Sequence, residues 1–204
     1  MSSLTFYTNP RSRGQIIRWM LEEVGVAYDT VLLEYGTTMK APEYLAINPM
    51  GKVPAIRHNG TVVTEAAAIC AYLADQFPSS QLAPPPSDPL RGTYYRWLFF
   101  GAGPQEMAAT SKALNWQVAE GQQGMVGFGS LDATFDTLAG AVAQGPWLCG
   151  EQFTAADVYV GSAVLWGMQF GTIPRRPEFE RYAARLQARP AAQRAQQLDA
   201  ALLK

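Results

Sequence analysis

Residues 47–56, Ile-Asn-Pro-Met-Gly-Lys-Val-Pro-Ala-Ile, contain the backbone of this chain that is best suited to chemistry. The segment reads as a loop that turns through Asn-Pro and Gly and then enters a strand at Pro54. Because proline cannot donate to a strand ladder, it is confined to strand starts, edges and bulges. Pro54 also restricts Val53 to an extended conformation, which leaves the Val53 N–H and C=O free to pair with a ligand. Such a backbone suits a peptide bound as an added strand, although an ordinary loop-to-strand junction is the alternative.

Other kinds of chemistry find little support in the sequence. His58 is the only histidine, and neither Cys70 nor Cys149 belongs to a Cys-x-x-Cys pair or a ligand cluster. A metal centre or a histidine-based catalytic triad is therefore not expected. The glycine-dense segment 121–129 follows a helical pattern and lacks a Lys-Ser/Thr ending, so we interpret it as a loop between helices rather than a phosphate-binding loop.

The composition is that of a soluble globular protein of 204 residues. With 16 basic and 17 acidic residues, the net charge is near −1 and provides no general attraction to nucleic acid or membranes. We therefore expect no nucleic-acid partner and no membrane partner. The chain starts without a basic region or an apolar run, no stretch is long enough to span a bilayer, and isolated cysteines fit a reducing compartment. These features predict a cytoplasmic location.

Short strands alternate with helices in the first eighty residues. The patterns predict strands at 4–7, 28–33, 53–58 and 61–64 and helices at 12–24 and 66–77. Asn59-Gly60 predicts a tight hairpin turn between the last two strands, and Gly25 predicts the end of the first helix. We therefore expect a small mixed sheet, in the order βαβ then ββα, with helices packed on it.

A proline-rich segment separates this α/β region from the rest of the chain. Residues 78–89 carry five prolines and show no periodicity, which is typical of a semi-rigid linker. Beyond them only helical patterns remain. We predict an α/β domain at residues 1–77, a linker at 78–87 and an all-helical domain at 88–204.

Taken together, these features resemble the cytosolic glutathione transferases, in particular the bacterial beta- and theta-like members. The segments that carry the resemblance are 7–13, 48–54, 64–69, 148–157 and 189–191. It covers essentially the whole chain. It implies a thioredoxin-like domain joined to an all-helical domain, a homodimer, and binding of the tripeptide glutathione and a small hydrophobic electrophile. Glutathione is then a co-substrate, and no other cofactor is implied.

The resemblance implies that a residue near the first helix lowers the pKa of the glutathione thiol. Only a few per cent of a thiol with a pKa of about 8.5 is nucleophilic thiolate at pH 7. Ser12 is expected to donate a hydrogen bond to that thiolate, where the helix dipole also favours an anion. Alternatively, Ser12 only caps the helix, Asn9 donates through its amide, or Tyr7 donates as in other classes. Asn9 is the second choice, and Tyr7 is expected to point into the core.

A set of glutathione contacts is also implied. Val53, beside Pro54, is expected to pair its backbone with the cysteinyl part. Glu65 is expected to bind the γ-glutamyl end at a helix N-terminus, where a carboxylate is favoured anyway. The family usually has Ser or Thr after this Glu, whereas Ala66 keeps the N–H but lacks the hydroxyl. Unless Thr64 replaces it, the lost hydrogen bond weakens glutathione binding by about 1.5–3 kcal/mol.

Four basic residues are candidates for binding carboxylates. Lys40 and Lys52 lie near positions that hold the glycine carboxylate of glutathione in the family, although surface lysines are commonly only solvated. Arg11 and Arg13 flank the start of the first helix, where cations oppose the helix dipole. They are either solvated or face a bound anion, which is a glutathione carboxylate or an acidic co-substrate.

The second substrate is expected to contact apolar side chains of the helical domain. The candidates at helical spacing are Tyr94, Trp97, Phe100, Met107, Trp166, Met168 and Phe170. Because such residues commonly belong to a core, we select Met107, Trp166 and Phe170 for the substrate pocket. Residues 154–157 predict a capping box that opens a helix at 155–170, so Asp157 is expected to be structural.

Three functions follow from these expectations. The first is an enzyme that conjugates glutathione to hydrophobic electrophiles in detoxification. The second is a glutathione-dependent disulfide or peroxide reductase, which would use two glutathione molecules because no cysteine lies near the first helix. The third is a non-catalytic binding module on the same fold, which Ala66 supports.

Overall fold

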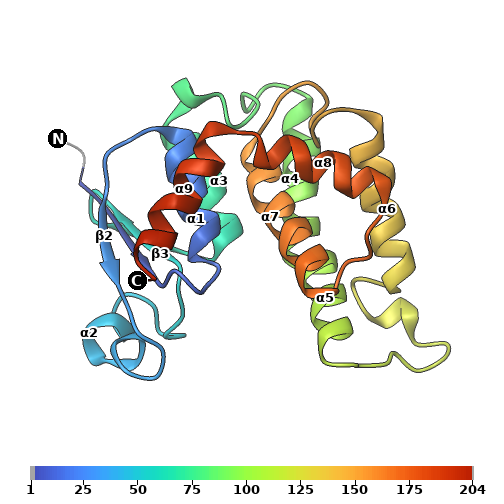
Figure 1. Ribbon diagram of the computed structural model, residues 1–204, viewed down its shortest axis with the longest axis horizontal. Coiled ribbons are helices and arrows are strands. Elements are labelled where there is room, and N and C mark those ends of the chain that lie inside the picture. Colours follow the sequence, from blue (N-terminus) through green and yellow to red (C-terminus); the bar gives the residue numbers. More distant parts are fainter. Residues whose placement is uncertain (1–2, 204) are drawn as a thin grey trace. The chain divides into compact units, whose positions relative to one another are not determined.

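The computed structural model describes residues 3–203, which divide into two compact units (Figure 1). Unit 1 runs to Gln81 and resumes at Arg189, and unit 2 spans Leu82–Ala188. Unit 1 is a mixed sheet covered by helices, and unit 2 is helical. The predicted fold class, a thioredoxin-like α/β domain followed by an all-helical domain, is confirmed.

Unit 1 is built on a four-stranded sheet in the order β2-β1-β3-β4. Its strands are β1 (Leu4–Thr8), β2 (Asp29–Leu32), β3 (Ala55–His58) and β4 (Thr61–Thr64). β2 is parallel to β1, whereas β3 is antiparallel to both β1 and β4. Asn59 and Gly60 have φ values of 49° and 86°, as a two-residue type I′ turn requires, so the predicted hairpin is confirmed.

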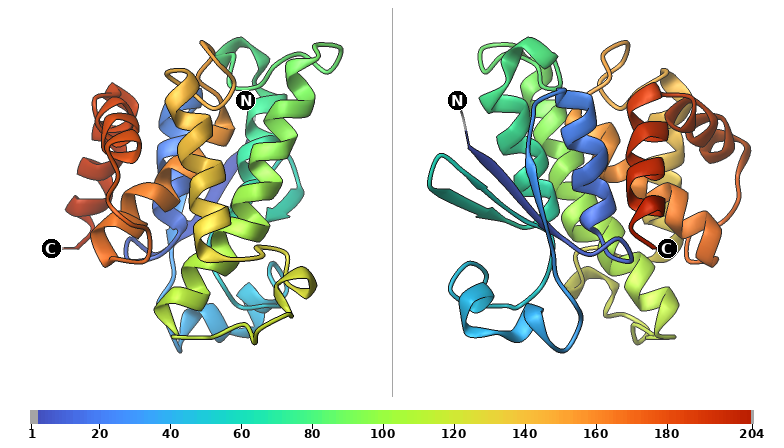
Figure 2. Two further views of the ribbon diagram at one scale, coloured as in Figure 1. Left: turned by 90° about the vertical axis from the view of Figure 1, so that its right-hand side faces the viewer. Right: turned by 60° about the vertical axis from the view of Figure 1, so that its left-hand side comes forward.

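The helices of unit 1 are α1 (Gly14–Val24), α2 (Pro42–Leu45), α3 (Ala66–Gln76) and α9 (Pro190–Ala201), with the 3-10 turns η1 (Thr38–Lys40) and η2 (Pro78–Ser80). Successive side chains of β1 point to opposite faces of the sheet. Phe6 faces α1, whose Arg18 guanidinium lies 5.0 Å from the ring centroid. Tyr7 faces α2 and packs against Tyr44. Tyr7 is therefore a core residue, as expected. The ribbon views in Figure 2 show α1 beside the sheet.

The last helix, α9, packs on α1 and belongs to unit 1 (Figure 1). Arg18 on α1 forms a buried ion pair with Asp199 at 3.2 Å, and Arg189 bonds both carboxylate oxygens of Glu23 at 2.6 and 2.7 Å. Burial raises the pKa of Asp199, and the neighbouring Arg18 opposes that rise. The sequence interpretation placed residues 88–204 in one helical domain. The observed helical unit ends at Ala188 because these ion pairs hold the following segment on α1.

The helices of unit 2 are α4 (Leu90–Phe100), α5 (Glu106–Ala113), α6 (Leu131–Gln144), α7 (Ala155–Phe170) and α8 (Pro177–Gln187), with the π turn η3 (Gly101–Gln105) and the 3-10 turn η4 (Gln123–Met125). Pro104 lies inside η3, where it has no N–H to donate to the preceding turn. Tyr94 and Trp97 are buried in the core of this unit. The glycine-dense segment connects α5 to α6, as predicted.

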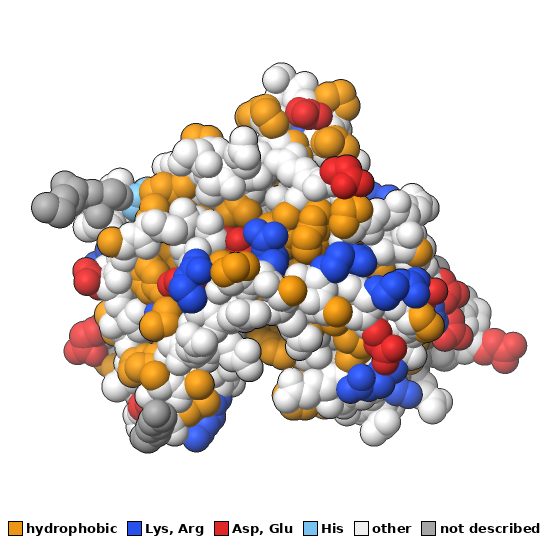
Figure 3. All heavy atoms as spheres, turned by 45° about the horizontal axis from the view of Figure 1, so that its top comes forward, with side chains coloured by type: hydrophobic (Ala, Val, Ile, Leu, Met, Phe, Trp, Pro, Cys, Tyr) orange, Lys and Arg blue, Asp and Glu red, His pale blue; other side chains and the backbone are white. Residues whose placement is uncertain are grey.

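The proline-rich segment is more ordered than a bare linker. It begins with η2, and Leu82 is buried with its carbonyl accepting the Ala155 N–H at 2.7 Å. On the face drawn in Figure 3, basic and acidic side chains are interspersed among apolar ones, in keeping with the near-neutral charge. Within residues 3–203, no helix has the length and apolar character needed to cross a membrane.

Candidate functional site

The segment before β3 is held in a fixed shape by its own side chains. The Tyr44 hydroxyl and the Asn48 amide both donate to the Lys52 carbonyl, at 2.6 and 2.7 Å. Asn48 also accepts the Met50 N–H at 3.1 Å, and Gly51 provides the φ of 58° that the turn needs. Burial raises the pKa of Tyr44 to about 12, so its hydroxyl retains the proton that it donates.

This arrangement leaves the backbone of Val53 open. In a trans peptide the C=O and N–H point in opposite directions, so the Val53 N–H points away from the donors on the Lys52 carbonyl. Strand pairing of β3 begins only at Ala55, two residues later than predicted, and the Val53–Pro54 peptide is cis. Within residues 3–203, neither the N–H nor the C=O of Val53 has a hydrogen-bond partner. The sequence predicted this open peptide.

Further polar groups lie at the start of α3. Glu65 precedes this helix with a φ of 68°, which is strained for a residue that has a Cβ atom. Its side chain is exposed, whereas the Ala66 side chain is buried. Thr64 pairs with Ala55 across the sheet, so Glu65 and Pro54 lie at the same end of their strands. The open peptide and a helix N-terminus, which favours anions, are therefore neighbours.

The four basic candidates differ in their partners. Lys40, which was expected near the glycine carboxylate of glutathione, donates to the Met50 and Gly51 carbonyls at 3.1 and 2.9 Å, so its ammonium supports the loop before β3. The charged ends of Lys52 and Arg11 are exposed and have no partner in the described part of the chain. Arg13, also exposed, is the residue at the N-terminal boundary of α1.

The turn between β1 and α1 satisfies its polar groups internally. The Ser12 hydroxyl donates to the Asn9 carbonyl at 2.6 Å and accepts the Gly14 N–H at 2.9 Å. The Asn9 side chain is buried, donates to the Leu33 carbonyl at 2.8 Å and accepts the Arg11 N–H at 2.9 Å. The helix begins at Gly14 rather than at residue 12, because these bonds form a separate turn first. The Ser12 proton that was expected to face a thiolate is thus held within the turn.

Thr8 is an exception in this turn, and sequence reasoning missed it. Its hydroxyl is buried and has no hydrogen-bond partner among the described residues. A Cβ atom on Gly14 would collide with this hydroxyl, so the helix start requires glycine. Because threonine is common in strands, its presence at position 8 did not indicate an unpaired hydroxyl. The hydrogen bond between the Asn48 side chain and the Met50 N–H could have been predicted from the sequence, because Asn side chains often bond the backbone two residues on.

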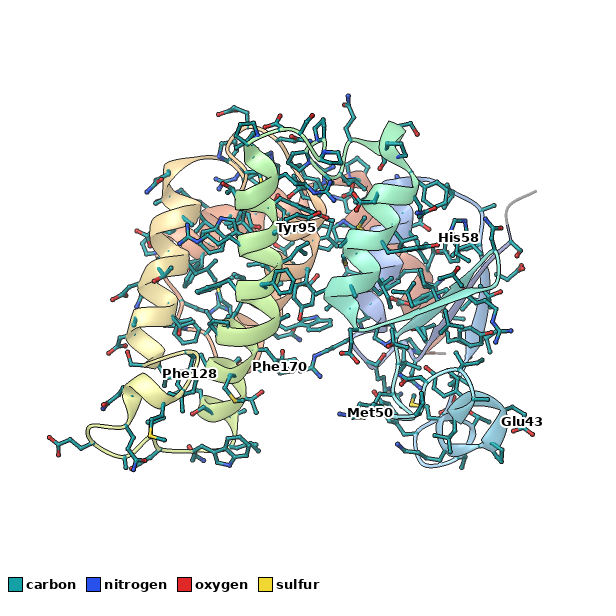
Figure 4. All side chains as sticks on the ribbon, turned by 180° about the vertical axis from the view of Figure 1, so that it is seen from behind. Glu43, Met50, His58, Tyr95, Phe128 and Phe170 are labelled. Carbon is teal, nitrogen blue, oxygen red and sulfur yellow. The ribbon has the colours of Figure 1, made fainter. Side chains whose placement is uncertain are left out.

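The apolar candidates of unit 2 are accessible to different degrees. Met107 on α5 is 46% exposed, and Phe170 is 72% exposed. Phe170 lies at the end of α7 and is labelled in Figure 4. Trp166 is half-buried and lies one turn before Phe170, so the two share a face of α7. All three are at least partly accessible to solvent.

Asp157, at the start of α7, belongs to a fully bonded buried network. Its carboxylate accepts the N–H of Leu148 at 2.8 Å, the Tyr182 hydroxyl at 2.9 Å and the N–H and hydroxyl of Thr154 at 2.9 and 3.1 Å. Burial raises the pKa of Asp157 to about 6, and these hydrogen bonds oppose the rise. The predicted capping box is present, which confirms its structural role.

Metal and thiol chemistry have no visible basis in the described part of the chain. Residues 3–203 contain no cluster of three or more His, Cys, Asp or Glu side chains able to hold a metal ion. Cys70 and Cys149 are free and buried, and burial raises the pKa of both thiols, that of Cys149 to about 11.

Comparison with known proteins identifies the family. Residues 12–76 match the glutathione S-transferase N-terminal domain, and residues 65–185 match the glutathione S-transferase C-terminal domain. Glutathione S-transferase GstA of Escherichia coli is 30% identical over 139 residues, a match that spans 61% of this chain and only 61% of that protein.

Solved structures extend the likeness over nearly the whole chain. A glutathione transferase from Methylococcus capsulatus has a TM-score of 0.80 and 29% identity, covering 97% of this chain and 99% of that one. A Sulfitobacter glutathione transferase homologue with bound glutathione has a TM-score of 0.78 and 25% identity, with coverage of 97% and 99%. Together with the open peptide at Val53 and the two domain matches, these likenesses show that the chain belongs to the glutathione S-transferase family.

Proposed function

We propose that this protein conjugates the thiolate of glutathione to hydrophobic electrophiles. The names of its relatives support a transferase, and the Sulfitobacter homologue supports glutathione as the co-substrate. The observation that carries the proposal is the Val53 peptide, whose N–H is turned outward by the bonds that Tyr44 and Asn48 make to the preceding carbonyl.

Glutathione binds to this peptide as a short added strand. The N–H and C=O of Val53 pair with the cysteinyl residue, and each hydrogen bond contributes about 0.5–1.5 kcal/mol. Pro54 keeps the next position out of the strand ladder. The γ-glutamyl carboxylate meets the N–H groups of Ala66 and the following residue, and the Glu65 carboxylate pairs with the γ-glutamyl ammonium.

The remaining charges of glutathione find partners among the basic residues. Lys52, which is exposed and unpaired in the described structure, binds the glycine carboxylate. Lys40 shapes the loop that presents Lys52, through its bonds to the Met50 and Gly51 carbonyls. Arg11 and Arg13 flank Ser12, and their positive charge lowers the pKa of a thiol held there.

Ser12 donates to the thiolate after a rotation of its hydroxyl. The Asn9 carbonyl that it leaves still accepts the Ser12 N–H at 3.1 Å, so the rotation leaves no carbonyl unpaired. The Gly14 N–H that donates to the Ser12 oxygen makes the hydroxyl a better donor. Asn9 is the second candidate donor, although its side-chain amide already bonds the Leu33 carbonyl and the Arg11 N–H.

The electrophile takes its apolar contacts from unit 2, where Met107, Trp166 and Phe170 are accessible. We also propose a homodimer. Tyr95 and Phe99 lie one turn apart on α4 and are 42% and 74% exposed, as expected of an apolar stripe covered by a second copy. The two buried free thiols support a cytoplasmic, reducing location.

The proposal is tested by retention on glutathione resin followed by turnover of 1-chloro-2,4-dinitrobenzene and of a small disulfide. We expect retention and conjugation. Ser12→Ala should lower kcat by about tenfold to a hundredfold, because it removes a donor to the reacting sulfur, with little change in glutathione affinity. Ser80→Ala is the matched control, since Ser80 also donates to a carbonyl three residues earlier, at 2.7 Å from Phe77.

One observation favours a second candidate function. The Ser12 hydroxyl is bonded within its own turn and Ala66 has no hydroxyl, as expected of a protein that binds glutathione without activating it. Retention without turnover of either substrate would support that binding module. Turnover of the disulfide alone would support a reductase.

A further inference from the structure

The unpaired hydroxyl of Thr8 lies at a point where the fold alone does not call for one. Thr8 ends β1, its side chain is fully buried, and its hydroxyl has no hydrogen-bond partner among residues 3–203. Buried hydroxyls in proteins are nearly always hydrogen-bonded, because a donor that has left water without a new acceptor is destabilising. Valine has almost the same shape as threonine and is at least as favourable in a strand. Valine at position 8 would therefore serve the fold better.

Gly14, the first residue of α1, makes room for this hydroxyl. A Cβ atom at position 14 would overlap the Thr8 oxygen and would lie 3.0 Å from the Ser12 oxygen. The φ of Gly14 is not positive, so the backbone conformation itself does not require glycine. Glycine is a poor helix former, and two unfavourable choices thus coincide at one point of the turn. Such coincidences are typical of functional sites.

The hydroxyls of Thr8 and Ser12 face the same point beside Gly14. Because a Cβ atom there would contact both oxygens, the two oxygens lie within about 5 Å of each other, a gap that a change of side-chain rotamer closes to hydrogen-bond distance. A serine hydroxyl donates one hydrogen bond and accepts two. Within the described structure the Ser12 oxygen accepts only the Gly14 N–H, at 2.9 Å, so one acceptor position remains open.

We propose that Thr8 is a positioning residue for the thiolate donor: its hydroxyl donates to the Ser12 oxygen when the Ser12 proton turns from the Asn9 carbonyl to the sulfur of glutathione. The inference rests on the proposed transferase function and deepens it. Thr8 does not touch glutathione, because its side chain is fully buried. It acts through Ser12, since a hydroxyl that accepts hydrogen bonds becomes a stronger donor to the thiolate. The bound thiol then has a lower pKa.

Thermal melting tests whether the hydroxyl lacks a partner in the protein without ligand. Thr8→Val removes the hydroxyl with little change of shape, so the variant should melt about 2–4 °C above the wild type. Thr5→Val makes the same substitution earlier on β1, where the side chain is only partly buried, and should melt within about 1 °C of the wild type. A Thr8→Val protein that melts below the wild type would show that the hydroxyl is already bonded, which overturns the inference.

The pH profile of kcat tests the role of Thr8 in the reaction. With saturating glutathione and 1-chloro-2,4-dinitrobenzene, kcat rises with pH as the bound thiol loses its proton. Thr8→Val should raise the pKa of this profile by about 0.5–1, which lowers kcat about threefold to tenfold below that pKa and leaves the plateau at high pH within about twofold. The KM for glutathione should stay within about twofold. Thr8→Ser, which keeps the hydroxyl, should restore the wild-type profile, and Thr5→Val should leave it unchanged.

The ultraviolet absorbance of the thiolate separates this inference from the proposed function, because it gives the pKa of the bound thiol without turnover. If that pKa is lowered in the wild type and rises in Thr8→Val while no conjugate forms, the inference stands and the transferase proposal fails. If the wild type forms conjugate and Thr8→Val has the same pKa and kcat, the inference is overturned and the transferase proposal stands. Absence of glutathione binding, or a bound thiol with the pKa of free glutathione, overturns the inference as well.

Discussion

The capping network around Asp157 and the open peptide at Val53 use polar groups in opposite ways. Four donors surround the Asp157 carboxylate, and all are within 3.1 Å. Next to Val53, the Lys52 carbonyl is held by two hydrogen bonds, yet the N–H and C=O of Val53 have no partner in residues 3–203. Closed networks specify the fold, and open groups on a rigid frame are available for a ligand.

Asp157→Ala gives the largest expected effect, because it turns the closed network into an open one. Four buried donors would lose their acceptor, which should lower the free energy of unfolding by about 3–5 kcal/mol. Urea denaturation followed by circular dichroism measures the change. Asp132→Ala, in the first turn of α6, removes only a favourable dipole interaction and should cost about 0.5 kcal/mol. Equal losses from the two variants would contradict the network.

The titration of the Asp157 carboxyl should also make the stability of the protein depend on pH. Because burial raises its pKa to about 6 in the fold, the native state holds this proton more tightly than the unfolded chain. The stabilising contribution is therefore complete below about pH 4 and lost as pH rises through about 6, a change of about 2–3 kcal/mol. Asp157→Asn cannot titrate, so the wild-type curve should fall relative to the variant across this window. Parallel curves would show that the pKa is ordinary.

Val53→Pro removes the N–H that the open peptide would donate to a ligand. Glutathione should bind about tenfold to a hundredfold more weakly, since the cysteinyl carbonyl loses its donor. Isothermal titration calorimetry measures this, and Val53→Ala, which keeps the N–H, should stay within about threefold. Similar affinities for the two variants would argue against added-strand binding.

Glu65→Gly has a smaller effect that acts in opposite directions on stability and binding. Relieving a φ of 68° should raise the free energy of unfolding by about 1 kcal/mol, whereas losing the carboxylate should weaken glutathione binding. Glu65→Gln keeps the strained backbone and should weaken binding without the gain in stability. Thermal melts and calorimetry on both variants make the comparison. A destabilised Glu65→Gly would show that the strain is absent.

Local pattern was enough to predict much of this molecule. The limits of β4 and α7 agree with their sequence patterns, because alternation, Asn59-Gly60 and the capping box act within a few residues. The open peptide at Val53 was predictable for the same reason, since Pro54 alone prevents strand pairing there.

Features that depend on distant partners were not predictable. Arg18 and Asp199 are 181 positions apart, and nothing near either residue indicates that the last helix returns to α1. Two features with partners close in sequence were missed as well: the direction of the Ser12 proton depends on the Asn9 carbonyl, and the shape of the Val53 loop depends on the Tyr44 hydroxyl. Only folded geometry decides between such acceptors.

The return of α9 to α1 has a consequence for biosynthesis. A ribosome releases the sheet and first three helices long before it releases Asp199, so the Arg18 guanidinium has no counter-ion there until the whole of unit 2 has been made. Until then the outer side of α1 is uncovered, and nascent chains at this stage are the ones that chaperones should recognise. Unit 1 is therefore completed only after unit 2, although its sheet is made first.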